Sequence, residues 1–127
     1  RQVIALCGSG WSYTKAQDYR DWRVLEDDAT IDVYNLTSSP LNARVKAYAL
    51  SVNGSKQVRV SNGAAKTFSM NQLADWPIAE LTLAPGLTQL RLTDAMWDKG
   101  RTPLVVAGLD ASVAPAPAAA AAPSPAP

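Results

Sequence analysis

The chain has 127 residues, a formal net charge of +1 at pH 7 and only 18% charged residues. It has no histidine and one cysteine, Cys7, which excludes an internal disulfide, a zinc cluster and the most common general base. The 12 basic residues are scattered rather than clustered, which argues against nucleic-acid binding, and nothing in these counts predicts a cofactor.

The first apolar run is Val3–Cys7, close behind an amino terminus that is Arg1 rather than Met. We therefore expect the chain to be a fragment or a processed product whose preceding residues are not shown. The run is either the end of a signal or membrane-spanning segment or a first β-strand, and by itself it is too short to cross a bilayer. Its length and its β-branched residues favour the strand.

From Trp22 onward, apolar and polar residues alternate with a period of two in short runs separated by turn residues. In the stretch from Ala29 to Asn35, Ile31 and Val33 face one way while Asp32 and Tyr34 face the other. The same pattern in the next run places four small or β-branched residues on one face. The strands predicted in this part of the chain are Trp22–Leu25, Ala29–Asn35 and Asn42–Ser51.

Two Asn-Gly pairs predict tight turns, because both residues tolerate the positive φ angles of a type I′ turn. Asn53-Gly54 predicts a hairpin between residues 43–51 and 56–61, and Asn62-Gly63 leads into a strand over residues 65–70. The polar stretch that follows, Asn71–Pro77, predicts a crossing loop because it ends in proline.

The last turn signal is Ala84-Pro85-Gly86, which is typical of a type II turn. It predicts a hairpin or a tight corner between strands at residues 78–83 and 87–92. A final strand is expected over residues 102–109, where Leu104, Val105 and Val106 form a continuous apolar run.

These elements predict an all-β fold, namely an antiparallel two-sheet β-sandwich of the jelly-roll or immunoglobulin-like kind with about eight strands. The sandwich is expected to occupy residues 1–112. Residues 113–127 are expected to form a disordered Ala/Pro-rich tail, since eight Ala, five Pro and one Ser make up the last 14 positions.

An acidic run, Glu26, Asp27 and Asp28, lies between two predicted strands. Carboxylates in such a loop can bind calcium, which makes the run a candidate metal site. The alternative is a solvated turn, because the run lacks the spacing and the glycine of specific calcium loops.

The chain has four tryptophans, of which Trp22 opens a predicted strand and is assigned to the core. Trp11, Trp76 and Trp97 fall in predicted loops and are candidates for stacking against sugar rings. The alternative for these three is that they close the ends of the sandwich.

Catalytic residues are not predicted. Ser9 lies between two glycines, but no histidine is available to activate it. Asp94 and Asp98 could form a carboxylate pair for glycoside hydrolysis only if a cleft brought them together.

Five segments in the order found here resemble the C-terminal β-sandwich domain of bacterial multi-pass membrane glycosyltransferases and related polytopic membrane proteins. The segments are Gly10-Trp11, Trp22–Leu25, Ala29–Asn35, Leu81–Leu87 and Pro103–Ala107. The resemblance implies an extracytoplasmic domain, periplasmic or at the cell surface, which follows a last membrane span near Val3–Cys7 and contacts glycan or lipid-linked sugar. No catalytic motif of these enzymes is present.

The leading hypothesis is therefore a non-catalytic extracytoplasmic accessory domain with a glycan or a membrane protein as its partner, and with membrane contact only through a missing N-terminal segment. A carbohydrate-binding module is the first alternative. A structural or interaction subunit of an envelope assembly is the second, and a small hydrolase is the third.

Overall fold

The structure is a computed structural model that describes residues 1–15, 21–25, 27–51, 56–61, 65–68, 73–94 and 104–114. Within these ranges the chain forms ten β-strands and no helix. The strands make two five-stranded sheets in which every neighbouring pair is antiparallel. The predicted all-β two-sheet sandwich is confirmed, with ten strands instead of about eight.

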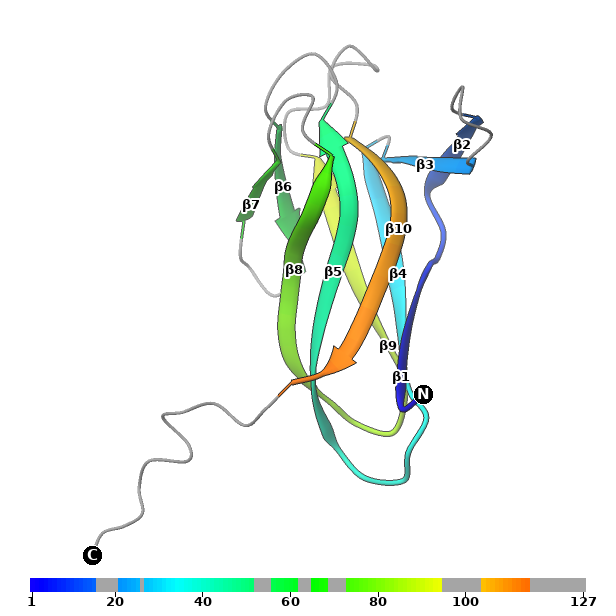
Figure 1. Ribbon diagram of the computed structural model, residues 1–127, viewed down its shortest axis with the longest axis vertical. Helices are drawn as coiled ribbons and strands as arrows, with labels where there is room; N and C mark the ends of the chain where they lie inside the picture. Colours follow the sequence, from blue (N-terminus) through cyan, green and yellow to red (C-terminus); the bar gives the residue numbers. More distant parts are fainter. Residues whose placement is uncertain are drawn as a thin grey trace, which may run out of the picture.

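The two sheets, which we call sheet A and sheet B, face each other across one core (Figure 1). In spatial order, sheet A consists of β1 (Val3–Cys7), β4 (Asp28–Asn35), β9 (Gly86–Asp94), β6 (Lys56–Val60) and β7 (Ala65–Phe68). Sheet B consists of β2 (Trp11–Lys15), β3 (Asp21–Leu25), β10 (Leu104–Val113), β5 (Leu41–Ser51) and β8 (Ala74–Leu83).

The core follows from the alternation in the sequence, because every second residue of a strand points to the same face. Ile31 and Val33 of β4 are fully buried, whereas the alternate residues Asp32 and Tyr34 are partly exposed, as predicted. Along β5 the buried positions are Ala43, Val45, Ala47 and Ala49. Burial of these inner faces removes apolar surface from water and is the main stabilising term of a sandwich.

The hairpin predicted at Asn53-Gly54 is wrong in its pairing. Strand β5 lies in sheet B, where β10 and β8 occupy both of its edges, and β6 lies in sheet A between β9 and β7. The chain therefore crosses from one sheet to the other between Ser51 and Lys56. The turn residues themselves lie outside the described residues, as do Asn62 and Gly63, but the antiparallel pairing of β6 with β7 confirms the second predicted hairpin.

The Pro85-Gly86 turn is the tight corner of the two alternatives, not a hairpin. Strand β8 enters it from sheet B and β9 leaves it in sheet A, and Gly86 has a φ of 94°. Because left-handed backbone favours glycine, this position allows the chain to change sheets within a few residues.

The loop predicted at Asn71–Pro77 is wrong from Ala74 onward, since β8 begins there and includes Trp76 and Pro77. Proline is tolerated because β8 is an edge strand and because a β-bulge shifts the register next to Val45. The loop expected at Trp11 is also wrong, because Trp11 opens β2.

Both ends of the described chain pair with neighbouring strands. Val3–Cys7 forms strand β1, which confirms the strand alternative for that run. At the other end Ala114 is buried, and its backbone N–H donates to the Asn42 carbonyl oxygen over 2.8 Å. Residues 115–127 lie outside the described residues, so the disordered tail stays a prediction.

None of the residues that the structure describes forms a helix long and apolar enough to cross a membrane. The membrane-protein context implied by the resemblance stays a prediction.

Candidate functional site

The two described candidate tryptophans lie at opposite edges of sheet B, Trp11 on β2 and Trp76 on β8. Three strands separate them, a distance on the order of 20 Å at the usual strand spacing of about 4.8 Å. Both indoles are partly buried and pack against the core. The Trp11 indole N–H donates to the Thr30 carbonyl over 2.7 Å, and that of Trp76 to the Ala49 carbonyl over 2.8 Å. The structure thus does not bring them onto one surface, and Trp97 lies outside the described residues.

The acidic run is only partly described, because Glu26 lies outside the described residues. Asp27 is exposed, with a φ of 147°, and Asp28 is the first residue of β4. The Asp28 carboxylate is engaged by protein groups: Oδ2 lies 3.4 Å from Arg91 Nη1, and Oδ1 accepts from Thr93 Oγ1 over 3.3 Å. Among the described residues no group of three or more His, Cys, Asp or Glu side chains could hold a metal ion. Calcium binding at this run stays a prediction.

Asp94 is the last residue of β9 and is buried, whereas Asp98 lies outside the described residues. The hydrolase alternative therefore gains no pair of carboxylates from the described part of the chain.

A cleft of about 460 Å³ lies between β1 and β10, next to β3. Backbone and apolar side chains make up most of its wall, and its ionisable groups are Cys7 and Arg23. Burial raises the pKa of the Cys7 thiol, and the Arg23 guanidinium lowers it by less. The thiol is therefore protonated at neutral pH, and the cleft offers a polar ligand few hydrogen-bonding groups.

The outer face of sheet A carries a polar surface in the described part of the chain. The alternation that buries one side of each strand turns the other side outward over four adjacent strands. Its members are Ile4 and Leu6 on β1, Asp28, Thr30, Asp32 and Tyr34 on β4, Leu87, Gln89, Arg91 and Thr93 on β9, and Gln57 and Arg59 on β6.

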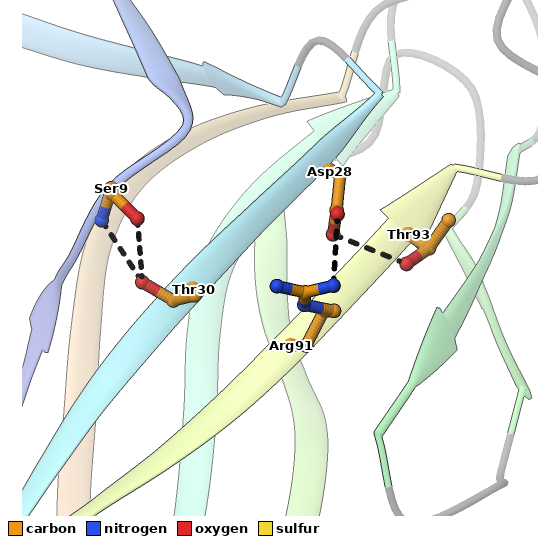
Figure 2. Close-up of polar contacts among 5 residues, drawn as sticks. All are labelled: Ser9, Asp28, Thr30, Arg91 and Thr93. Carbon is orange, nitrogen blue, oxygen red and sulfur yellow. Dashed lines mark hydrogen bonds and ion pairs between the residues drawn. The ribbon is translucent and has the colours of Figure 1, made fainter.

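One end of this face is a network of charged and hydroxyl groups (Figure 2). Arg91 reaches diagonally from β9 to Asp28 on β4, beside the Thr93 hydroxyl that donates to the same carboxylate. On the other side of β4, the Ser9 backbone N–H donates to Thr30 Oγ1 over 2.9 Å. One row away, Gln89 Nε2 donates to Asp32 Oδ1 over 2.9 Å.

The other end of the face is apolar. Ile4, Tyr34 and Leu87 form one cross-strand row over β1, β4 and β9. Leu87 is 51% exposed and Leu6 of the next row is 53% exposed, although both are large apolar residues. A surface that joins an aromatic and aliphatic area to a set of donors and acceptors can bind a ligand that is itself amphipathic, with C–H faces and hydroxyl edges.

Sequence reasoning missed this face, although it identified the outward direction of Asp32 and Tyr34. The signal was the period-two alternation of β4 and β9. Their pairing, Thr30 with Arg91 and Asp32 with Gln89, joins residues about 60 positions apart and could not be read from either strand alone.

The fold is similar to those of solved carbohydrate-binding proteins. A GH26-CBM35 β-(1,4)-mannanase of Podospora anserina matches with a TM-score of 0.62 and 12% identity, covering 92% of this chain. The CBM36-1 domain of a multidomain xylanase from the hindgut metagenome of Trinervitermes trinervoides matches with a TM-score of 0.59 and 11% identity, covering 89% of this chain and 97% of that one. A CBM36 module in complex with calcium and xylotriose matches with a TM-score of 0.52 and 16% identity, covering 85% and 98%.

This chain spans only 29% of the length of the Podospora anserina enzyme. No family model matches the sequence, and no curated protein matches it. At these identities the similarity shows the fold, a β-sandwich shared with carbohydrate-binding modules.

Proposed function

We propose that this chain is a carbohydrate-binding domain that holds a glycan against the outer face of sheet A. The observation that carries the proposal is the composition of that face, in which Tyr34 and Leu87 lie beside Asp32 and Gln89 on adjacent strands. A sugar ring has apolar C–H faces and polar edges, so it can pack on the first pair and hydrogen-bond to the second.

The fold similarity supports the same proposal. One structural neighbour is a CBM36 module bound to xylotriose, and another is the CBM36-1 domain of a multidomain xylanase. A non-catalytic binding role also fits the groups of the described site. These are guanidinium, amide and hydroxyl groups and carboxylates that neighbouring side chains already bind, and none of them is an activated nucleophile.

We also propose that the domain is an accessory part of a larger extracytoplasmic protein that has a membrane protein as its partner. A topology reporter fused to the native full-length protein tests this: reporter activity outside the cytoplasm is expected, and activity inside contradicts it.

The binding proposal is tested with the full chain by affinity electrophoresis against xylan, β-1,4-mannan, cellulose derivatives and acidic polysaccharides. Retardation by at least one polysaccharide is expected. Tyr34→Ala and Gln89→Ala should weaken it about fivefold to tenfold, since each removes a contact worth about 1 kcal/mol.

The matched control is Tyr48→Ala, because Tyr48 is 37% exposed on the outer face of the opposite sheet. It should bind as the wild type does. Trp97→Ala examines the earlier stacking hypothesis: loss of binding in that variant alone would move the site away from sheet A. Absence of retardation by every polysaccharide contradicts the proposed function, provided that thermal unfolding shows a folded chain.

A further inference from the structure

Two arginines and two hydroxyl residues line a shallow depression of about 310 Å³ on the outer face of sheet A. Besides Val60, the wall has Arg59 near the end of β6, Ser61 directly after that strand, and Arg91 and Thr93 on β9. All four side chains can donate hydrogen bonds. The depression belongs to the face proposed to bind glycan, but its chemistry differs from that of the Tyr34 end.

The strand register arranges these groups in alternation. Arg59 lies opposite Thr93, and Val60 lies opposite Leu92, so Ser61 continues the register to the level of Arg91. Arg59 and Arg91 are consequently diagonal neighbours, whose Cα atoms are typically about 7–8 Å apart in an antiparallel pair. Two guanidinium groups at that spacing can reach one ligand group between them.

The described wall of the depression contains two arginines and no carboxylate. Asp28 is the carboxylate next to the depression, and Arg91 Nη1 already lies 3.4 Å from its Oδ2 (Figure 2). Arg59 is exposed and forms no ion pair with any residue in the described part of the chain. Arg59 is therefore the cation of the depression that the described residues leave available to a ligand.

We infer that this depression is an anion subsite and that the recognised glycan is acidic. Guanidinium forms paired hydrogen bonds with planar carboxylates and with the oxygens of sulfate-like groups. The hydroxyls of Ser61 and Thr93 can donate to the same anion. Uronate carboxylates and sulfate esters share this chemistry, and the inference rests on the proposed function of sheet A.

The test uses two pairs of polymers, each with one backbone in an anionic and a neutral form, with the full chain in each case. Polygalacturonate is compared with its methyl-esterified form, and dextran sulfate is compared with dextran. At least one acidic polymer should bind about tenfold more tightly than its neutral partner, and the difference should shrink as NaCl is raised. Polygalacturonate alone assigns the anion as a carboxylate, and dextran sulfate alone assigns it as a sulfate.

Three arginine variants distinguish specific binding at this subsite from nonspecific electrostatic attraction to the whole protein. Arg59→Gln should weaken acidic-polymer binding about tenfold, as expected for loss of a charge-assisted hydrogen bond. Arg91→Gln should weaken it further, because Asp28 is then left without its cation. Arg44→Gln removes the same charge from sheet B, where Arg44 Nε lies 3.4 Å from Glu80 Oε2, and should leave binding unchanged.

Equal weakening of acidic-polymer binding by Arg59→Gln and Arg44→Gln overturns the inference, because binding would then depend only on the net charge of the protein. Equal binding of the charged and neutral polymer in both pairs also overturns it. Binding of neutral polysaccharides without acidic ones overturns the inference while the proposed function stands. Failure to bind any glycan, neutral or acidic, overturns the proposed function and this inference with it.

Discussion

Gly10 lies between β1 and β2 and has a φ of 89°. A Cβ atom placed there would lie 2.8 Å from the Ala29 Cα atom and closer still to the Asp28 carbonyl oxygen, and neither backbone atom can move aside. Gly10→Ala should therefore lower the free energy of unfolding by about 2–4 kcal/mol, through backbone strain and overpacking together. Urea denaturation followed by tryptophan fluorescence measures the change.

Two other glycines distinguish the effect of backbone strain from the effect of overpacking. Gly86 has a φ of 94° but open space around its would-be Cβ, so Gly86→Ala should cost only the backbone term of about 1–2 kcal/mol. Gly108 has neither a positive φ nor a close neighbour, and Gly108→Ala should stay within about 0.5 kcal/mol of wild type. Equal losses in all three variants would contradict the steric account of Gly10.

Cys7 gives the fold a dependence on alkaline pH. Burial raises the pKa of its thiol, with a smaller opposing effect of Arg23, so the folded state holds the thiol proton more tightly than the unfolded chain. The associated stability is fully present below the ordinary cysteine pKa and is lost as pH rises through the raised pKa.

Cys7→Ser should flatten this alkaline decline in the free energy of unfolding. In the native protein, the reaction of Cys7 with a disulfide reagent should accelerate at a higher pH than it does in the urea-unfolded chain. Identical pH profiles for the folded and unfolded thiol would disprove the burial effect.

At the scale of elements, Asn35 joins the end of β4 to the loop before β5 and to the opposite sheet. Its side-chain amide donates to the carbonyls of Ser39 and Leu83, over 2.8 and 3.1 Å, and its oxygen accepts from Thr37. Asn35 is 2% exposed, and its bond to the Leu83 carbonyl is buried, whereas those to Ser39 and Thr37 are partly buried.

Asn35→Asp should destabilise the fold by about 2–4 kcal/mol at neutral pH, because it leaves two carbonyls without a donor and places a carboxylate beside them. Thermal unfolding measures the loss, and acidification should recover part of it. The control is Asn42→Ala, where a partly exposed side chain accepts one hydrogen bond from Thr82. A similar loss in both variants would argue against a special role for Asn35.

The sequence predicted strands well where alternation was long. The buried faces of β4 and β5 were assigned correctly, because a period of two over seven or more residues has few other physical explanations. Which strands pair with each other was harder to predict from the sequence. Asn53-Gly54 and Pro85-Gly86 are turn signals in the backbone, and turn chemistry does not specify whether the next strand returns to the same sheet or crosses to the other.

Pro77 also shows that a local sequence signal does not specify the place of a strand in the sheet. Proline predicts a loop because it lacks an N–H donor, but at the edge of sheet B that donor is not needed. Edge position depends on the whole sheet order, so the strand around Trp76 could not be assigned locally. The candidate site was missed for a similar reason: Arg59, Arg91 and Asp28 become neighbours only through the β4-β9-β6 pairing.

At the scale of the whole molecule, the residues that pack the core and the residues proposed to bind glycan lie on different surfaces. Two of the described tryptophans, Trp11 and Trp76, pack against the core from sheet B, and the outer face of sheet A carries an exposed polar network. The core can therefore keep its packing while residues of the outer face change, since surface substitutions usually alter stability by less than about 0.5 kcal/mol. This separation makes binding and stability measurable in different variants.

The most direct test of the central claim is to map amide chemical shifts of ¹⁵N-labelled full chain during titration with an oligosaccharide of whichever polysaccharide it binds. The account predicts that the largest shift changes fall in β4, β9 and β6, around Tyr34, Gln89 and Arg59, with small changes around Tyr48 on the opposite sheet. Changes concentrated on sheet B, or confined to residues 95–103, would contradict the assignment of the glycan site to the outer face of sheet A.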